Sequence, residues 1–139
     1  MIKAYIDCNI LIDWLLDREP YSYYAAKVIE YTEEKKIKSY ISALTLANTY
    51  YIITKEINKK VGNEFLKDAL KLFSFTGMSE EVIIRAIERP YKDFEDALHY
   101  NVAIEYGLDY IITRNKKDFP NNIGIALADA EEFIKKVLK

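Results

Sequence analysis

Three groups of acidic and amide side chains, far apart in the sequence, could share a divalent cation. Asp7 follows an apolar run at residues 2–6, acids occur at 93–96, and Asn115 and Asp118 follow a second apolar run. Carboxylates gathered in one pocket repel each other, so such a cluster ordinarily needs a cation to hold it together. Oxygen ligands favour hard ions such as Mg²⁺ or Mn²⁺, and water bound to such an ion is a nucleophile suited to phosphodiester attack.

Polar neighbours of these acids could support the same chemistry. Asn9 and Asn115 offer neutral oxygen ligands or positions that hold a water, and Thr113 could orient a water or a phosphate oxygen. Basic side chains beside the last acidic group could contact a nucleic-acid backbone. The residues expected to make such phosphate contacts are Arg114, Lys116 and Lys117.

Each of these acids also has an ordinary structural explanation. Asp7 is well placed to cap a helix, and acids such as Asp93 and Glu95 in a first helical turn favour the helix dipole. Asp118 could simply form a turn. His99 lies on the face of Asp96 but is more typical of a packed or solvated histidine than of a general base.

The elements that would position these residues alternate between strands and helices. Short runs rich in β-formers predict strands, and apolar positions at helical spacing predict helices between them. The alternation indicates an α/β class with a mainly parallel sheet, whose strands end at a common ligand-binding edge. We expect Gly62–Asn63 to break the helix that starts after Ser42. The predicted strands are 2–6, 37–41, 74–76, 108–113 and 123–126, and the predicted helices are 10–16, 21–35, 43–60, 64–72, 80–87, 93–105 and 129–139.

Composition narrows the class of protein further. The 139 residues predict one domain, 1–139, and the net charge of −2 argues against coating nucleic acid by bulk charge. Cys8 is the single cysteine and His99 the single histidine, which excludes an internal disulfide and a thiolate or imidazole-rich metal site. No signal peptide or membrane span is evident, so we expect a soluble cytoplasmic protein.

Four segments, in this order and spacing, resemble the PIN-domain family, which includes the ribonuclease toxins of bacterial toxin–antitoxin pairs. The resemblance implies a three-layer α/β/α sandwich with a mainly parallel sheet of 4–5 strands, and Mg²⁺- or Mn²⁺-dependent cleavage of single-stranded RNA. It also implies a homodimer and an antitoxin that covers the first helices near the site. The segments are 6–13, 41–48, 93–98 and 110–119.

The family's acidic set would fall on Asp7, Asn48, Asp96, and Asn115 or Asp118. Two of these positions, 48 and 115, carry an amide where many family members carry an acid. We expect Asp7 and Asp96 to be direct ligands, with Asp118, Glu95 or Asn115 completing the shell, partly through water.

Two other functions stay open from the sequence. The amides at 48 and 115 motivate a binding module that has lost catalysis and acts through RNA or a protein partner. Asp7-Cys8-Asn9 after a first strand faintly resembles the nucleophile turn of haloacid-dehalogenase-type phosphatases, although Asn9 would be a poor general acid.

Overall fold

The computed structural model describes residues 1–120 and 124–137 and has a five-stranded sheet at its centre. The strands lie in the order β3-β2-β1-β4-β5, and every neighbouring pair is parallel. The strands are β1 (Ile2–Ile6), β2 (Ile37–Ser42), β3 (Ser74–Thr76), β4 (Tyr110–Ile112) and β5 (Ala126–Ala128). The helices are α1 (Cys8–Leu15), α2 (Ser22–Glu33), α3 (Ala43–Glu56), α4 (Lys59–Leu72), α5 (Glu80–Glu88), α6 (Phe94–Glu105), the short 3₁₀ helix η1 (Lys116–Asp118) and α7 (Ala130–Val137).

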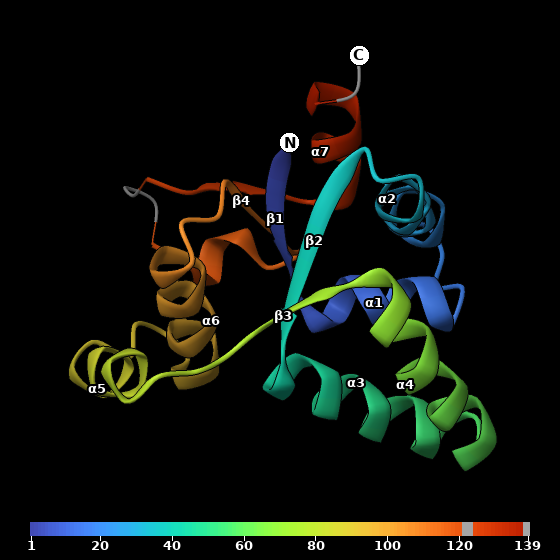
Figure 1. The fold of residues 1–139 in the computed structure, drawn as a ribbon, viewed down its shortest axis with the longest axis horizontal. Coiled ribbons are helices and arrows are strands. Elements are labelled where there is room, and N and C mark those ends of the chain that lie inside the picture. Colours follow the sequence, from blue (N-terminus) through green and yellow to red (C-terminus); the bar gives the residue numbers. More distant parts are fainter. Residues whose placement is uncertain (121–123, 138–139) are drawn as a thin grey trace.

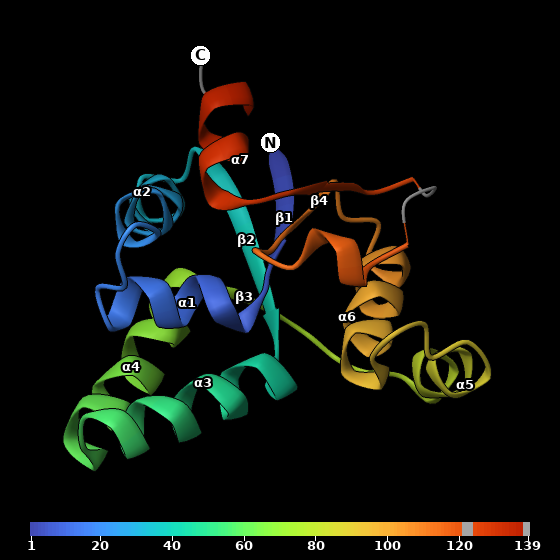
Figure 2. The ribbon, with the colours of Figure 1, turned by 180° about the vertical axis from the view of Figure 1, so that it is seen from behind.

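Helices cover both faces of this sheet, so the expected three-layer α/β/α sandwich is confirmed (Figure 1). Successive residues of β1 point to opposite faces because the side-chain period of a strand is two. Ala4 and Ile6 pack in a core with α1, α2, α4 and α7, whereas Tyr5 packs in a second core with α5 and α6. The view from behind shows α5 and α6 on the side of the sheet away from α2 and α4 (Figure 2).

The central strand β1 is the point at which the chain changes the side of the sheet to which it adds strands. The chain moves from β1 to β2 and β3 on one side, and then returns to place β4 and β5 on the other. The crevice outside the carboxyl ends of two such strands is the usual ligand site of an open parallel sheet. The Asp7 N–H donates to the Ile112 carbonyl at 3.0 Å, which fixes the end of β1 beside the end of β4. This crevice is where the fold gathers the acids.

The prediction that Gly62 breaks a helix is wrong. The break comes earlier, where α3 ends at Glu56 and the Asn58 side chain accepts from the Val61 N–H at 2.8 Å to cap α4. Gly62 lies buried inside α4, where a Cβ would come within 2.4 Å of Thr54 Oγ1. The glycine therefore serves close packing between two helices, which outweighs its low helix propensity.

We expect Gly62→Ala to lower the free energy of unfolding by about 1 kcal/mol. Overpacking costs about 1–3 kcal/mol, whereas alanine recovers about 1 kcal/mol of helix propensity. Urea unfolding measures the change, and Thr54→Ala is the matched background because it removes the nearest clashing atom. A cost of equal size in both backgrounds would mean that the α3–α4 contact does not require glycine.

The C-terminal elements differ slightly from the predicted ranges. The strand predicted at 123–126 is found at Ala126–Ala128, and Ile123 lies outside the described residues. The last helix begins at Ala130, while Leu138 and Lys139 of the predicted range also lie outside them. No helix in the described part of the chain has the length and apolar character to cross a membrane.

Candidate active site

An acidic pocket of about 340 Å³ lies at the carboxyl ends of β1 and β4. Its walls come from the first turn of α1, the turn between α1 and α2, the start of α6 and the segment after β4. Five carboxylates line it, although their positions span more than a hundred residues of sequence. The lining residues are Asp7, Cys8, Asn9, Ile12, Arg18, Asp93, Glu95, Asp96, Asn115 and Asp118.

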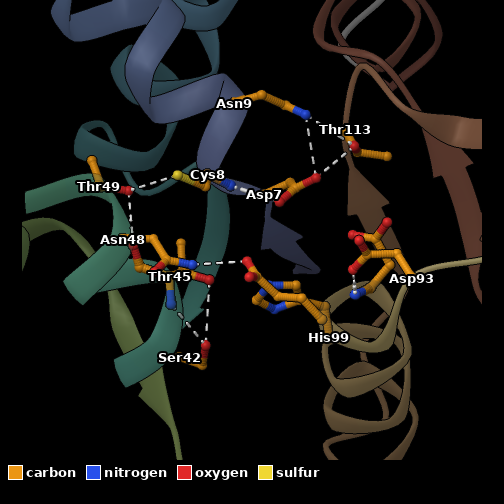
Figure 3. Close-up of polar contacts among 12 residues, drawn as sticks. Asp7, Cys8, Asn9, Ser42, Thr45, Asn48, Thr49, Asp93, His99 and Thr113 are labelled. Carbon is orange, nitrogen blue, oxygen red and sulfur yellow. Dashed lines mark hydrogen bonds and ion pairs between the residues drawn. The ribbon is translucent and has the colours of Figure 1, made fainter. Parts of the chain in front are cut away.

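Asp7 is held rigidly at the floor of this pocket. Its Oδ1 accepts from the Cys8 N–H at 2.8 Å, which makes it the N-cap of α1 as the structural explanation anticipated. Its Oδ2 accepts from the Thr113 hydroxyl at 2.7 Å and from Asn9 Nδ2 at 3.3 Å (Figure 3). Since Asp7 is only 7% exposed, these donors stabilise its carboxylate in a largely dry position.

Asp96 faces the same pocket from the first turn of α6. Asp93 caps this helix, with its Oδ1 accepting from the Asp96 N–H at 3.1 Å, so the Asp96 carboxylate is left free of that role. Figure 3 shows Asp93 at the start of α6, and Asp93 lines the same pocket as Asp7. Burial, followed by the negative charges of Asp7, Asp93 and Asp118, raises the pKa of Asp96 to about 7.

The raised pKa of Asp96 predicts a pH-dependent stability of the metal-free protein. The ordinary pKa is 3.8, so the folded state binds this proton more tightly than the unfolded state does. The free energy of unfolding should therefore fall as pH rises from about 4 to about 7 and then level off. We expect this contribution to be about 1–2 kcal/mol, because a half-buried side chain keeps part of its solvent screening.

Urea unfolding of the metal-free protein between pH 4 and pH 8 tests this expectation, with Asp96→Asn as the variant that cannot titrate. The decrease in unfolding free energy should be smaller in Asp96→Asn. Identical pH profiles for the two proteins would contradict the raised pKa.

Glu95 is held by two partners at the rim of the pocket. Asn48 Nδ2 donates to Glu95 Oε1 at 2.8 Å, and His99 Nε2 lies 3.5 Å from the same oxygen. His99 is 1% exposed and its Nδ1 is hydrogen-bonded to the Tyr5 hydroxyl at 2.5 Å, so it is a packed histidine. The pKa of Glu95 lies below its usual range, mainly because of the hydrogen bond with His99. The charge interaction with His99 and the hydrogen bond from Asn48 lower this pKa further.

The segment after β4 brings Asn115 and Asp118 to the pocket. The Asn115 N–H donates to the Thr113 hydroxyl at 3.0 Å, and the Arg114 N–H donates to Asn9 Oδ1 at 3.3 Å. These bonds tie the segment to the same Thr113 and Asn9 side chains that hold Asp7. Asn115 and Asp118 therefore lie in the same pocket as Asp7, as expected for residues that follow neighbouring parallel strands.

The three predicted basic residues do not line the acidic pocket. The Arg114 guanidinium donates to both oxygens of Asp13, at 2.7 and 3.1 Å, and lies over the Tyr21 ring. Lys116 forms an ion pair with Glu132, and Lys117 lines two neighbouring pockets. Their proposed contacts with RNA phosphates stay predictions, and for Arg114 and Lys116 they would require leaving a carboxylate partner.

The donor set suits a hard divalent cation, although no three His, Cys, Asp or Glu side chains in residues 1–120 and 124–137 already stand in a shared ligating arrangement. Mg²⁺ commonly binds proteins through one or two carboxylates and keeps several waters, so it needs no closed cage. Burial is the largest cause of the raised pKa of Asp96, and the negative charges of Asp7, Asp93 and Asp118, which also raise it, are charges that such an ion would neutralise.

Sequence reasoning missed Arg18 and Asp13. Arg18 lies in a turn without a periodic pattern, and no spacing rule pointed to its place in the pocket. Asp13 is fully buried. An acid at a core-facing position of a predicted helix could have indicated that a basic side chain from elsewhere in the chain pairs with it.

Together, the fold and the pocket define an α/β/α protein with clustered carboxylates at its topological switch point. The chain belongs to the PIN-domain family, whose model, described as PIN domain, matches residues 3–117. This assignment replaces the phosphatase alternative and confirms the resemblance found in the sequence.

Relatives within this fold come from several bacteria. The chain is 24% identical to Ribonuclease VapC1 of Aquifex aeolicus, over 96% of this chain and 94% of that protein. A toxin–antitoxin complex from Klebsiella pneumoniae contains a chain that is 26% identical, with a TM-score of 0.67 over 88% of this chain and 95% of that one. VapBC2 from Rickettsia felis, solved with a DNA fragment from its promoter, shares the fold at 18% identity, with a TM-score of 0.68 over 92% and 98%.

Proposed function

We propose that residues 1–139 act as one PIN domain that cleaves single-stranded RNA with the help of Mg²⁺ or Mn²⁺. The observation that carries this proposal is the meeting of five carboxylates in one pocket, where burial, and after it the charges of the neighbouring carboxylates, raises the pKa of Asp96 to about 7. A site that is strained without a cation is suited to bind one.

In this proposal Asp7 and Asp96 are direct ligands, and Asp118, Glu95 or Asn115 complete the shell, partly through water. The bound ion would supply an acidic water and neutralise charge that develops on the phosphate. Thr113 and Asn9 hold the Asp7 carboxylate in position through the hydrogen bonds described above. Asn48 and His99 do the same for Glu95, which keeps that carboxylate ionised near neutral pH.

We also propose that the protein is the toxin of a toxin–antitoxin pair. Support comes from relatives that are named as a ribonuclease and as a member of a toxin–antitoxin complex. An antitoxin partner, a homodimer and a cytoplasmic location follow as predictions. We expect the antitoxin on the aromatic first helices, with Trp14, Tyr21 and Tyr24, of which Tyr21 is exposed.

A second candidate is a binding module that has lost catalysis. Asn48 favours it, because an amide stands where many family members carry an acid, and its side chain is bound to Glu95 rather than lining the pocket. In the nuclease proposal Glu95 replaces the missing charge, whereas in the module the pocket binds no ion. Calorimetric titration with Mn²⁺ separates the two, since the module should show no binding at millimolar concentration.

The activity is tested with purified protein and end-labelled RNA, offered as single strands and as a duplex. We expect cleavage of the single strand with Mn²⁺ or Mg²⁺, little cleavage of the duplex, and none with a chelator. Cleavage that persists in the chelator would contradict metal dependence, and binding of RNA with neither Mn²⁺ binding nor cleavage would favour the module.

A further inference from the structure

We infer that Arg18 is the residue with which the acidic pocket binds a phosphate of the RNA backbone, an inference that rests on the proposed nuclease function. Arg18 lies between α1 and α2 and lines the same pocket as Asp7 and Asp96. Within the described residues, it is the one basic side chain that does so. The residues expected from sequence to contact phosphate, Arg114 and Lys116, are instead paired with Asp13 and Glu132.

The Arg18 guanidinium has no carboxylate partner among residues 1–120 and 124–137, although five carboxylates share its pocket. The neighbouring Glu19 does not take that role, because its Oε1 accepts from the Ser22 hydroxyl at 3.0 Å. The N–H donors of Arg18 are therefore available to a ligand that enters the pocket.

The backbone around Arg18 fixes the point from which this side chain reaches the pocket. Its N–H donates to the Asp13 carbonyl at 3.0 Å, and its own carbonyl accepts from the N–H groups of Tyr21 and Ser22 at 2.9 and 2.7 Å. The side chain itself is exposed. An anchored backbone with an exposed guanidinium combines a defined position with access to a ligand from solvent.

Charge explains why the pocket needs this residue. Five carboxylates outweigh the charge of one divalent ion, so an RNA phosphate would still meet a negative surface. A guanidinium binds two phosphate oxygens in parallel, which adds orientation as well as attraction. Arg18 and the bound ion would then contact the phosphate from different walls of the pocket.

A purely structural role for Arg18 makes the opposite prediction for metal binding. If Arg18 only balanced the acids and held the pocket together, Arg18→Ala would weaken the binding of Mn²⁺. If Arg18 binds phosphate, the loss of a positive charge should leave Mn²⁺ affinity equal or higher while RNA affinity falls. The two readouts move in different directions, so they distinguish the two roles.

The experiment measures binding of a short single-stranded RNA to a background that keeps all five pocket carboxylates, the otherwise unchanged protein with Ca²⁺ in place of Mn²⁺, over a range of salt concentrations. In that background we compare Arg18→Ala and Arg18→Lys with Arg85→Ala, which changes an exposed arginine on α5 paired with Glu81. Loss of one contact should weaken binding by roughly fivefold at about 0.1 M salt and reduce the log–log salt slope by about 0.7. Arg18→Lys should keep the slope and lose only part of the affinity.

Affinity and slope in Arg18→Ala equal to those in Arg85→Ala would overturn the inference, as would weaker binding of Mn²⁺ by Arg18→Ala in the otherwise unchanged protein. Failure of the proposed function looks different, because the unchanged protein would then not cleave the RNA, whether or not it binds it. Wild-type cleavage together with unaltered RNA binding by Arg18→Ala would refute the role of Arg18 alone.

Discussion

Asp96→Asn is expected to lower the rate of Mn²⁺-stimulated cleavage of single-stranded RNA by at least about a hundredfold while the protein stays folded. Changing a residue that merely supports a metal ligand commonly costs about 10- to 100-fold, so a direct ligand should cost at least the upper value. Asp7→Asn should have a similar effect, because Asp7 lies at the floor of the same pocket.

The stability of Asp96→Asn separates loss of chemistry from loss of structure. An amide carries no charge, so it removes both the cost of burying a carboxylate and the repulsion from Asp7, Asp93 and Asp118, which together raise the pKa of Asp96. The metal-free variant should therefore be at least as stable as the unchanged protein above pH 7. The matched control is Asp68→Asn, an exposed acid on α4 outside the pocket, which should retain full activity. Full activity of Asp96→Asn would remove this residue from the proposed ligand set.

Arg114→Ala is expected to have the largest effect on stability, lowering the free energy of unfolding by about 2–4 kcal/mol. The Asp13 carboxylate is 1% exposed and receives two hydrogen bonds from Arg114, whose side chain is 28% exposed. Removing the guanidinium leaves a buried charge without a partner, which costs about 3–5 kcal/mol where both partners are fully buried. The partial exposure of Arg114 reduces this value somewhat.

The Asp13–Arg114 ion pair also links α1 to the segment that carries Asn115 and Asp118. Asp13→Leu combined with Arg114→Met should restore most of the stability, because a buried ion pair can be replaced by apolar side chains. Urea unfolding of the single and double variants measures this. A small loss in Arg114→Ala would contradict the structural role and return Arg114 to the set of candidate phosphate contacts.

The positions of the acids could be predicted because the ends of the strands can be recognised in the sequence. The run before Asp7 and the run before Thr113 both read as strands, and parallel strands bring their carboxyl ends to one edge. The acids at 93–96 predicted the start of a helix there, and in the structure Asp93 is the N-cap of α6. Local sequence patterns therefore predicted which carboxylates would lie in one pocket, although they could not give the distances between them.

The partners of the charged side chains could not be predicted in this way. Arg114 looked like a phosphate contact because it stands beside acids in sequence, yet it pairs with Asp13, which is 101 positions away. The role of Arg18 was missed because it lies in a turn, where the sequence has no periodic pattern. Gly62 was interpreted as a helix break because close packing between two helices cannot be recognised from the neighbouring residues alone. Each case depends on tertiary contacts, which overrule local preference.

The central claim, that the pocket holds one divalent cation between segments distant in sequence, is tested most directly by soaking crystals of the protein in Mn²⁺ and recording anomalous diffraction. We predict a strong anomalous peak between the carboxylates of Asp7 and Asp96, within reach of Asp118 directly or through water, and no peak in crystals of Asp7→Asn. A fully soaked crystal with no peak in this pocket, or with manganese bound only elsewhere, would contradict the account.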